Sequence, residues 1–265
     1  MIQPNLVLTA AHCVVDEDAW AAAGGPGVAP PTPRKKILLA KNNIKYDWRK
    51  DVLVGADAES TSREIFIHPD YEVSDGNDIA IIRTKTSEPL PKPFVRLAGR
   101  KEGLRLGANV TAVGFGVNNN YISNDLFQNS PRLFEVDLTV SRPGVAPCPP
   151  RTTEEEESEV CNSTIDCYPG IKTGKEVCIV GGWFYQNPDR PNPNQDSGVG
   201  VKGACSGDSG GPVYHRGKQS GIAARVLRKD LCGELALNPF TVYTLVSAHR
   251  RDFIDPIIRA NPFRG

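Results

Sequence analysis

The sequence predicts an all-β fold, and three observations support that prediction. Short segments rich in β-branched residues recur along the chain, bounded by Gly, Pro, Asn or Asp; they cover residues 37–39, 64–68, 79–83, 109–113, 133–140, 221–226 and 241–246. Helical spacing is missing between them, so the pattern favours a sandwich or barrel over alternating β–α units. The 25 glycines and 22 prolines indicate the many turns that such folds need.

One helix and three insertions complete the predicted elements. The helix covers residues 247–260, because its apolar residues share one face: Phe253, Ile254, Ile257 and Ile258. Residues 18–36 and 149–159 are predicted insertions, the first rich in Ala, Gly and Pro and the second acidic. Residues 186–203 are so rich in Asn, Pro and Gly that we expect no regular structure there.

Charge and hydropathy exclude several function classes. The 265 residues include 31 Lys and Arg against 31 Asp and Glu, so no net field favours nucleic acid or an anionic membrane. No apolar run approaches the roughly 18 residues of a membrane span. The opening residues lack the basic and apolar segments of an export signal. We therefore expect no nucleic-acid partner, no membrane association and, in the sequence as given, no signal peptide.

The cysteines bear on the redox compartment. There are seven: Cys13, Cys148, Cys161, Cys167, Cys178, Cys205 and Cys232. Their spacing forms no zinc-type pair of CxxC motifs, so we predict no metal site, and we expect no cofactor. Free thiols in a cytosolic protein are one interpretation. Three disulfides and one orphan fit better, and an odd count suggests a partner cysteine outside the sequence shown.

Three short motifs carry chemistry. The first, LTAAHC, contains His12, and the second, NDIAII, contains Asp78 at the mouth of an apolar strand. The third, GDSGGP, puts Ser209 in a turn so rich in glycine that its backbone can approach a substrate closely. Each motif alone is modest, but the three together in this order are specific.

These residues predict nucleophilic catalysis. A serine hydroxyl is a poor nucleophile unless a base removes its proton, and His12 can take that proton and return it to the leaving amine. Asp78 would fix the imidazole tautomer and stabilise the imidazolium. The N–H groups of Gly207 and Ser209 would form an oxyanion hole, where losing one donor typically costs about 100- to 1,000-fold in rate. We predict a catalytic triad of His12, Asp78 and Ser209.

The chain resembles the chymotrypsin/trypsin-like serine peptidases over nearly its whole length. Besides the triad motifs and their His–Asp–Ser order, four strings carry the resemblance: HPDY at 68–71, VGFG at 113–116, LFEVDLTV at 133–140 and VYT at 242–244. It implies two six-stranded antiparallel β-barrels with the triad at their seam. The single peptidase domain would comprise an incomplete N-terminal barrel at 1–105, a C-terminal barrel at 106–246, and a helix and tail at 247–265.

The same resemblance implies disulfides. Cys205 and Cys232 match the pair that braces the specificity pocket, and Cys178 matches one half of a second bridge. Cys13 matches a cysteine whose partner lies upstream. The remaining cysteines allow two pairings, between which the sequence does not choose: Cys148–Cys178 with Cys161–Cys167, or Cys167–Cys178 with Cys148–Cys161.

The N-terminus departs from the family pattern. In the family an activation cleavage frees an Ile-Val-Gly-Gly-like N-terminus, whose ammonium pairs with the aspartate before the serine, here Asp208. The chain begins at Met1, shortly before His12, so we expect an N-terminal truncation. We expect Asp208 to swing out or take up a proton, or else to meet another base such as Lys202. An IVGG string at 179–182 falls where the family has a plain loop, and we interpret it as coincidence.

The resemblance assigns the substrate pocket to Gly203, Ala204, Ser206, Val226 and Thr241. Trypsin-like members carry aspartate where this chain has Gly203, so a cationic side chain would find no counter-ion. Val226 and Thr241 would narrow the slot, as in elastase-like members. The implied P1 residue, which precedes the cleaved bond in the substrate, is therefore small and aliphatic.

Two further departures precede the first wall of the pocket. Family members have Ser-Trp where this chain has Ala224 and Arg225. The serine hydroxyl supports the triad aspartate, and the tryptophan forms an apolar wall for the substrate. With this wall replaced, we expect Arg225 to select acidic groups on the substrate.

The predicted function is that of a serine endopeptidase that acts on proteins or peptides through an acyl-enzyme and is open to protein protease inhibitors. The alternative is a non-catalytic homologue that serves as a binding module; the departures above favour it, and the intact triad opposes it. The odd cysteine count and two glycosylation sequons predict a secreted parent protein. Of the sequons, Asn162 is favoured because Asn109 opens a predicted core strand.

Overall fold

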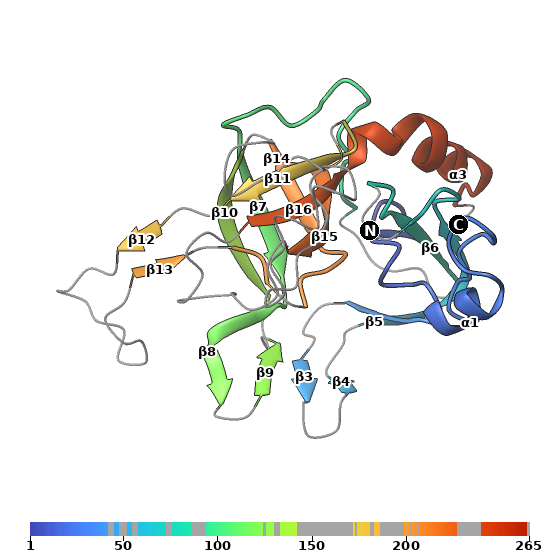
Figure 1. Cartoon of the computed structure of the whole chain (residues 1–265), viewed down its shortest axis with the longest axis horizontal. Coiled ribbons are helices and arrows are strands. Elements are labelled where there is room, and N and C mark those ends of the chain that lie inside the picture. Colours follow the sequence, from blue (N-terminus) through green and yellow to red (C-terminus); the bar gives the residue numbers. More distant parts are fainter. Residues whose placement is uncertain are drawn as a thin grey trace, which may run out of the picture.

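Two antiparallel β units form the framework of the described part of the protein (Figure 1). The structure, a computed structural model, describes residues 1–41, 45–47, 52–54, 58–72, 76–85, 94–123, 126–129, 133–141, 172, 174–180, 183–185, 199–201, 203–205, 207–226 and 240–263. The first unit is a sheet of N-terminal strands, and the second is a closed barrel of later strands. The predicted all-β class is thus confirmed.

The N-terminal unit is a four-stranded sheet with the order β1-β6-β5-β2. Apolar residues around β6 alternate between its faces, as the period of two in a strand requires. Ile79 and Ile81 belong to one buried cluster, whereas Ala80 and Ile82 belong to another. The strands are β1 (Leu6–Thr9), β2 (Leu38–Lys41), β5 (Ala58–Ile67) and β6 (Ala80–Thr84).

The C-terminal unit is a closed barrel with the strand order β10-β11-β16-β15-β14-β7. β7 completes the ring by pairing with both β10 and β14, so the barrel has no open edge. The described N-terminal strands instead form an open sheet. The barrel strands are β7 (Asn109–Gly114), β10 (Phe134–Val140), β11 (Glu176–Val180), β14 (Pro212–His215), β15 (Lys218–Val226) and β16 (Phe240–Leu245).

Three antiparallel hairpins extend from these units (Figure 1). Strand β13 falls within residues 186–203, so the prediction that this segment holds no regular structure is wrong. Its Val-Gly-Val string pairs with the aromatic β12, and such residues favour strands even amid turn-forming neighbours. The hairpins are β3 (Lys45–Asp47) with β4 (Val52–Val54), β8 (Val117–Ser123) with β9 (Leu126–Asn129), and β12 (Trp183–Tyr185) with β13 (Val199–Val201).

Two barrel strands, β11 and β14, were missing from the sequence prediction. The expectation of a plain loop at Ile179 and Val180 is wrong, because both residues lie in β11. Ile179 is 1% exposed and packs in the barrel core, which accounts for its apolar character. β14 has only four residues directly after the glycine-rich turn, so its strand signal is short.

Helix α1 (Glu17–Ala22) lies in a segment predicted as an insertion, and the sequence analysis missed it. The side chain of Asp16 caps its N-terminus by accepting a hydrogen bond from the N–H of Ala19 at 3.1 Å. Trp20 anchors the helix, because it is buried and its indole N–H donates to the carbonyl of Ala29 at 2.8 Å. Six residues are too few for a periodic pattern, but a capping aspartate before Glu17 is a recognised start signal.

The C-terminal helix is wound in three ways. Val246–His249 forms a 3₁₀ turn, Arg250–Ile254 a π turn and α3 (Asp255–Ala260) an α-helix. The predicted helix is therefore correct in place but wrong in its uniform winding. Pro256 explains the change, since it has no N–H to donate to the carbonyl four residues back. Among the described residues no helix is long and apolar enough to cross a membrane.

A buried apolar cluster joins the two units at their seam. It draws on β1, on the strand that follows Asp78, on β15 of the barrel and on the C-terminal helix. This seam core therefore fixes the position of the N-terminal sheet against the barrel. Its members are Ile2, Leu6, Leu8, Ala10, Ile79, Ile81, Ile222, Val246, Phe253 and Ile254.

We predict that Ile222→Ala lowers the free energy of unfolding by about 2–5 kcal/mol, because it removes buried apolar atoms and leaves a cavity. Ile222 is 0% exposed. Equilibrium unfolding in urea measures the change. Val28→Ala, at a residue 79% exposed, is the control and should shift the free energy by less than about 0.5 kcal/mol. Equal losses in the two variants would contradict a stabilising seam core.

Candidate active site

The pairing of β1 with β6 brings His12 and Asp78 together. Thr9, the last residue of β1, is the register partner of Ala80, the first residue of β6. The chain therefore leaves β1 beside the point at which it enters β6. His12 follows β1 by a few residues, and Asp78 lies two residues before the buried start of β6. Residues 66 positions apart in the sequence therefore become neighbours.

Asp78 holds His12 through two hydrogen bonds. One carboxylate oxygen accepts the backbone N–H of His12 at 2.9 Å, and the other lies 2.7 Å from the Nδ1 atom of its ring. Asp78 is 5% exposed, so water competes little for these bonds. With its Nδ1 proton directed at the carboxylate, the neutral ring keeps Nε2 as a proton acceptor.

Opposing effects act on the pKa of His12. Burial lowers the pKa of the ring, but the hydrogen bonds and charges of Asp78 and of the Cys13 thiol raise it to about 10. The Cys13 sulfur lies 3.5 Å from Nε2, and Cys13 is a free cysteine. The Asp78 carboxylate therefore favours the imidazolium form of His12, which agrees with its predicted role of stabilising that charge.

The turn that carries Ser209 packs against the segment that carries His12. Its Gly207 and Gly210 have φ angles of 91° and 75°, in the left-handed region that favours glycine. A Cβ atom on Gly210 would lie 2.3 Å from the Thr9 hydroxyl and 3.1 Å from the Cys13 sulfur. Only glycine fits this contact, which brings the exposed Ser209 turn of the barrel to the His12 segment of the sheet.

Asp208 points inward in the same turn. Its carboxylate accepts the N–H groups of Gly116 at 2.6 Å and Cys205 at 2.9 Å. Burial raises the pKa of Asp208, and these two bonds lower it in part. Of the two expected responses, the outward swing of Asp208 is wrong, because backbone donors compensate the inward carboxylate. The raised pKa is in the direction of the other response, the uptake of a proton. Lys202, the alternative partner, lies outside the described residues.

The predicted pocket residues are described only in part. Ala204 and Thr241 are buried, and Gly203 is half-buried. Val226 is the register partner of Thr241 at the junction of β15 and β16, which places the two wall positions side by side. Ser206 and the side chain of Val226 lie outside the described residues. The proposed role of these residues in specificity stays a prediction.

The cysteines are described in part as well. Cys178 and Cys205 each take part in a disulfide bond, whereas Cys13 is free. The other cysteines lie outside the described residues, so the pairings stay predictions: Cys148, Cys161, Cys167 and Cys232.

Arg225 forms an ion pair that the sequence analysis missed. Its guanidinium donates twice to the carboxylate of Glu176, through Nη1 to Oε1 and through Nη2 to Oε2 at 3.0 Å. The side chains are 8% and 0% exposed. The expectation that Arg225 selects acidic groups of a substrate is wrong, because Glu176 already binds the guanidinium. Buried charges of opposite sign predict such pairing, but sequence alone does not identify the partner.

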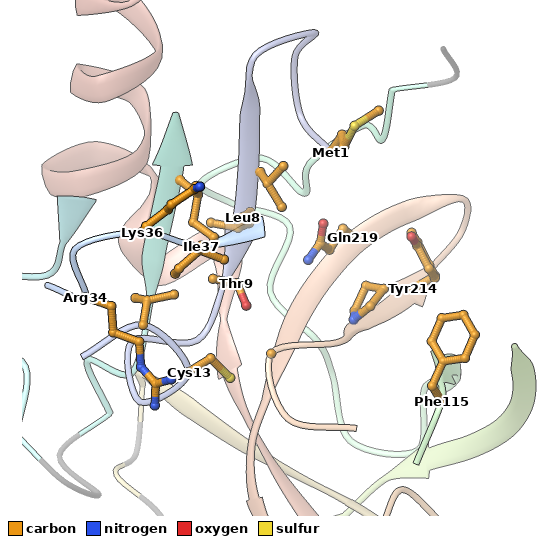
Figure 2. A pocket seen from close by; sticks show the side chains of 15 residues that line it. Met1, Leu8, Thr9, Cys13, Arg34, Lys36, Ile37, Phe115, Tyr214 and Gln219 are labelled. Atoms are coloured by element: carbon orange, nitrogen blue, oxygen red, sulfur yellow. The ribbon is translucent and has the colours of Figure 1, made fainter. Parts of the chain in front are cut away.

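A cavity of about 680 Å³ opens beside the triad segment. Figure 2 shows Thr9 and Cys13 on one side of it and Phe115 and Tyr214 on the other. Gly210 also lines it, so the cavity reaches the serine turn. The described residues hold no cluster of three or more His, Cys, Asp or Glu side chains that could bind a metal ion.

Comparison with protein families agrees with this geometry. The family model described as Trypsin matches residues 1–143, more than half of the chain. The chain belongs to the trypsin family. This membership accounts for the closed barrel, the second sheet and the short C-terminal helix, and it confirms the resemblance drawn from the sequence motifs.

Two curated proteins are similar to this chain at low identity. It is 25% identical over 225 residues to Brachyurin of Leptuca pugilator, in an alignment that covers 84% of this chain and 73% of Brachyurin. It is 27% identical over 238 residues to Tryptase of Mus musculus, with 86% of this chain and 66% of Tryptase covered. At this distance the family and fold carry over, whereas specificity has to be argued from individual residues.

We predict that Asp78→Asn destabilises the protein more at about pH 6 than at about pH 10, because the variant loses the carboxylate that favours charged His12. The raised pKa of His12 means that this stabilisation is complete below the usual histidine pKa of 6.5 and is lost as the pH rises through about 10. Urea unfolding at both pH values should show a difference of the order of 1 kcal/mol. A pH-independent effect of the substitution would contradict the charged pair.

Proposed function

We propose that the protein is a serine endopeptidase whose catalytic triad is His12, Asp78 and Ser209. One observation carries this proposal: the glycine turn bearing Ser209 packs against the segment of His12, whose ring a buried carboxylate orients. Membership of the trypsin family supports the same chemistry and favours protein or peptide substrates. The proposed activity needs no metal or cofactor, because the three side chains supply base, nucleophile and charge stabilisation.

In the proposed mechanism, the Ser209 oxygen attacks the carbonyl carbon of the scissile bond while Nε2 of the neutral His12 ring takes the hydroxyl proton. Because the pKa of His12 is raised to about 10, the fraction of this neutral ring grows as the pH rises toward that value. Asp78 stabilises the resulting imidazolium through the Nδ1 hydrogen bond of 2.7 Å. The imidazolium then gives its proton to the leaving amine, and the C–N bond breaks to leave an acyl-enzyme. Water attacks the ester with His12 again acting as base, which releases the acid and restores Ser209.

The oxyanion that forms during attack would be bound by the N–H groups of Gly207 and Ser209. Asp208 supports this role, because its carboxylate ties the turn to Gly116 and to the backbone of Cys205. The turn is also held at Gly210, whose N–H donates to the carbonyl of Ala223 at 2.8 Å. Donors fixed before the reaction need no reorganisation in the transition state.

The proposed specificity is for small aliphatic P1 residues. Gly203 offers no carboxylate to a cationic side chain, and the β-branched Val226 and Thr241 would narrow the pocket formed with Ala204 and Ser206. The antiparallel register of Val226 and Thr241 makes the two residues neighbours on adjacent strands, which supports their assignment to one pocket.

A non-catalytic binding module is the second candidate, and one observation favours it. The free Cys13 sulfur lies 3.5 Å from His12 Nε2, the atom that must accept the Ser209 proton. Ala224 also lacks the hydroxyl by which the family supports its triad aspartate. In the described structure both hydrogen bonds to Asp78 come from His12 itself, which supplies an alternative support.

We also propose that the parent protein acts outside the cell. The disulfide-bonded Cys178 and Cys205 suit an oxidising compartment. Of the two sequons, Asn109 opens barrel strand β7 as predicted, but it is exposed there, so its place in the strand does not disfavour it. Asn162 lies outside the described residues. Extracellular protein protease inhibitors are the proposed regulators.

We predict that Ser209→Ala reduces peptide hydrolysis about a million-fold, because it removes the nucleophile. The exposed serine contributes little to packing, so the unfolding midpoint should stay unchanged. Turnover of a peptide anilide and covalent labelling by a fluorophosphonate measure the loss. Absence of labelling in the folded parent protein would support the binding module instead.

We predict that alanyl and valyl peptide anilides are cleaved with kcat/KM at least about ten-fold higher than arginyl or lysyl ones, because Gly203 provides no counter-ion. Gly203→Asp is the matching variant and should narrow or reverse this ratio. A parent protein that prefers arginyl substrates would refute the proposed pocket.

A further inference from the structure

The loop that carries Asp78 is held by contacts with the turn that leads into β11 of the barrel. Asn77, directly before Asp78, is 1% exposed, and its side chain bridges the two units. Its amide donates to the carbonyl of Asp70 at 2.8 Å, within the N-terminal part of the chain. Its Oδ1 atom accepts a hydrogen bond from the Lys175 ammonium at 2.7 Å, from the turn that leads into β11 of the barrel.

The β11 turn also presses on the glycine before Asn77. A Cβ atom on Gly76 would lie 3.0 Å from the Cβ of Lys175 and 3.1 Å from that of Lys172. The C-terminal helix makes a third contact, since His249 Nε2 lies 3.0 Å from the Gly76 carbonyl. Burial lowers the pKa of His249 to about 4, so the neutral ring can donate this bond at neutral pH.

The Arg225–Glu176 ion pair stabilises the turn that leads into β11. Glu176 Oε2 accepts the N–H of Lys172 at 2.7 Å, and the N–H of Glu176 donates to the Lys172 carbonyl at 2.9 Å. The guanidinium of Arg225 binds the same carboxylate from β15. Buried ion pairs often add little stability over apolar replacements, so this pair is better explained by the geometry that it enforces.

We propose that Lys175 and the Glu176–Arg225 pair are positioning residues for the triad. They hold the loop of Asp78 against the barrel that carries Ser209, and thereby keep the carboxylate aligned with both hydrogen-bond donors of His12. This inference rests on the proposed function and deepens it. The charged and titratable groups that surround the loop are Lys172, Lys175, Glu176, His68, Asp70, His249 and Asp252.

The test uses Lys175→Met, which removes the ammonium but keeps the aliphatic stem. The readout is the pKa of His12, measured by NMR titration in a Ser209→Ala background, where no turnover is needed. We expect this pKa to fall, because a misaligned Asp78 favours the imidazolium less. Loss of a nearby positive charge alone would raise it, so a rise or no change overturns the proposal. Lys175→Arg, which retains a donor, should restore the pKa in part.

Kinetics in the Ser209 protein supply the second readout. Lys175→Met should lower kcat about ten-fold with KM nearly unchanged, since substrate contacts are intact. Lys218→Met is the matched control, because Lys218 pairs with the exposed Glu102 and should alter neither value. Arg225→Met combined with Glu176→Leu tests the ion pair without leaving a lone buried charge, and should reproduce the effects of Lys175→Met. An unchanged His12 pKa in this double variant overturns the role of the pair.

The two hypotheses fail in different ways. If the parent protein hydrolyses no substrate while Lys175→Met still lowers the pKa of His12, the peptidase proposal fails and the positioning role stands. If the parent hydrolyses peptides and Lys175→Met changes neither the pKa of His12 nor kcat, the positioning role fails and the peptidase proposal stands.

Discussion

The close approach of Gly210 to the end of β1 constrains the whole site. The nucleophile belongs to the barrel, whereas the base and its carboxylate belong to the sheet, so chemistry depends on how the two units meet. A Cβ on Gly210 would lie 3.3 Å from the backbone nitrogen of Ala10 as well as against the Thr9 hydroxyl. The contact therefore leaves no room for a side chain between the two segments. Catalytic groups must be held to within ~0.5 Å of their productive positions. The seam core, shared by both units and the C-terminal helix, supplies the rigidity.

Around this contact, backbone N–H groups stabilise the buried carboxylates by hydrogen bonding. Asp208 sits between Gly114 and Gly116, where a Cβ on Gly114 would lie 1.9 Å from its carboxylate. The absence of two side chains makes room for the carboxylate and exposes an N–H group to it. His12 likewise gains its second bond to Asp78 through its backbone N–H. The buried carboxylates of Asp78 and Asp208 thus both accept hydrogen bonds from main-chain N–H groups whose positions are set by turns and strands.

Local patterns predicted much of this protein, and long-range partners account for what they missed. The strands with clear β-branched periodicity lie where expected, and the motifs of His12, Asp78 and Ser209 were visible in the sequence. The glycine-rich turn predicted that its backbone makes a close contact. The partner in that contact, Thr9, lies far away in the chain and was not predicted. The roles of Arg225 and Asp208 were misjudged for the same reason, because Glu176 and Gly116 become their neighbours only on folding.

The seam core also has a consequence for how the protein is made. Ile2 and Leu6 from the start of the chain pack with Phe253 and Ile254 near its end. During synthesis on the ribosome, the N-terminal strands therefore emerge long before the residues that cover them. Domains generally fold as units while the chain emerges, and exposed apolar surface favours aggregation in the interval. The nascent sheet keeps part of its apolar face uncovered until Phe253 and Ile254 are translated, so the order of synthesis delays the closing of the seam.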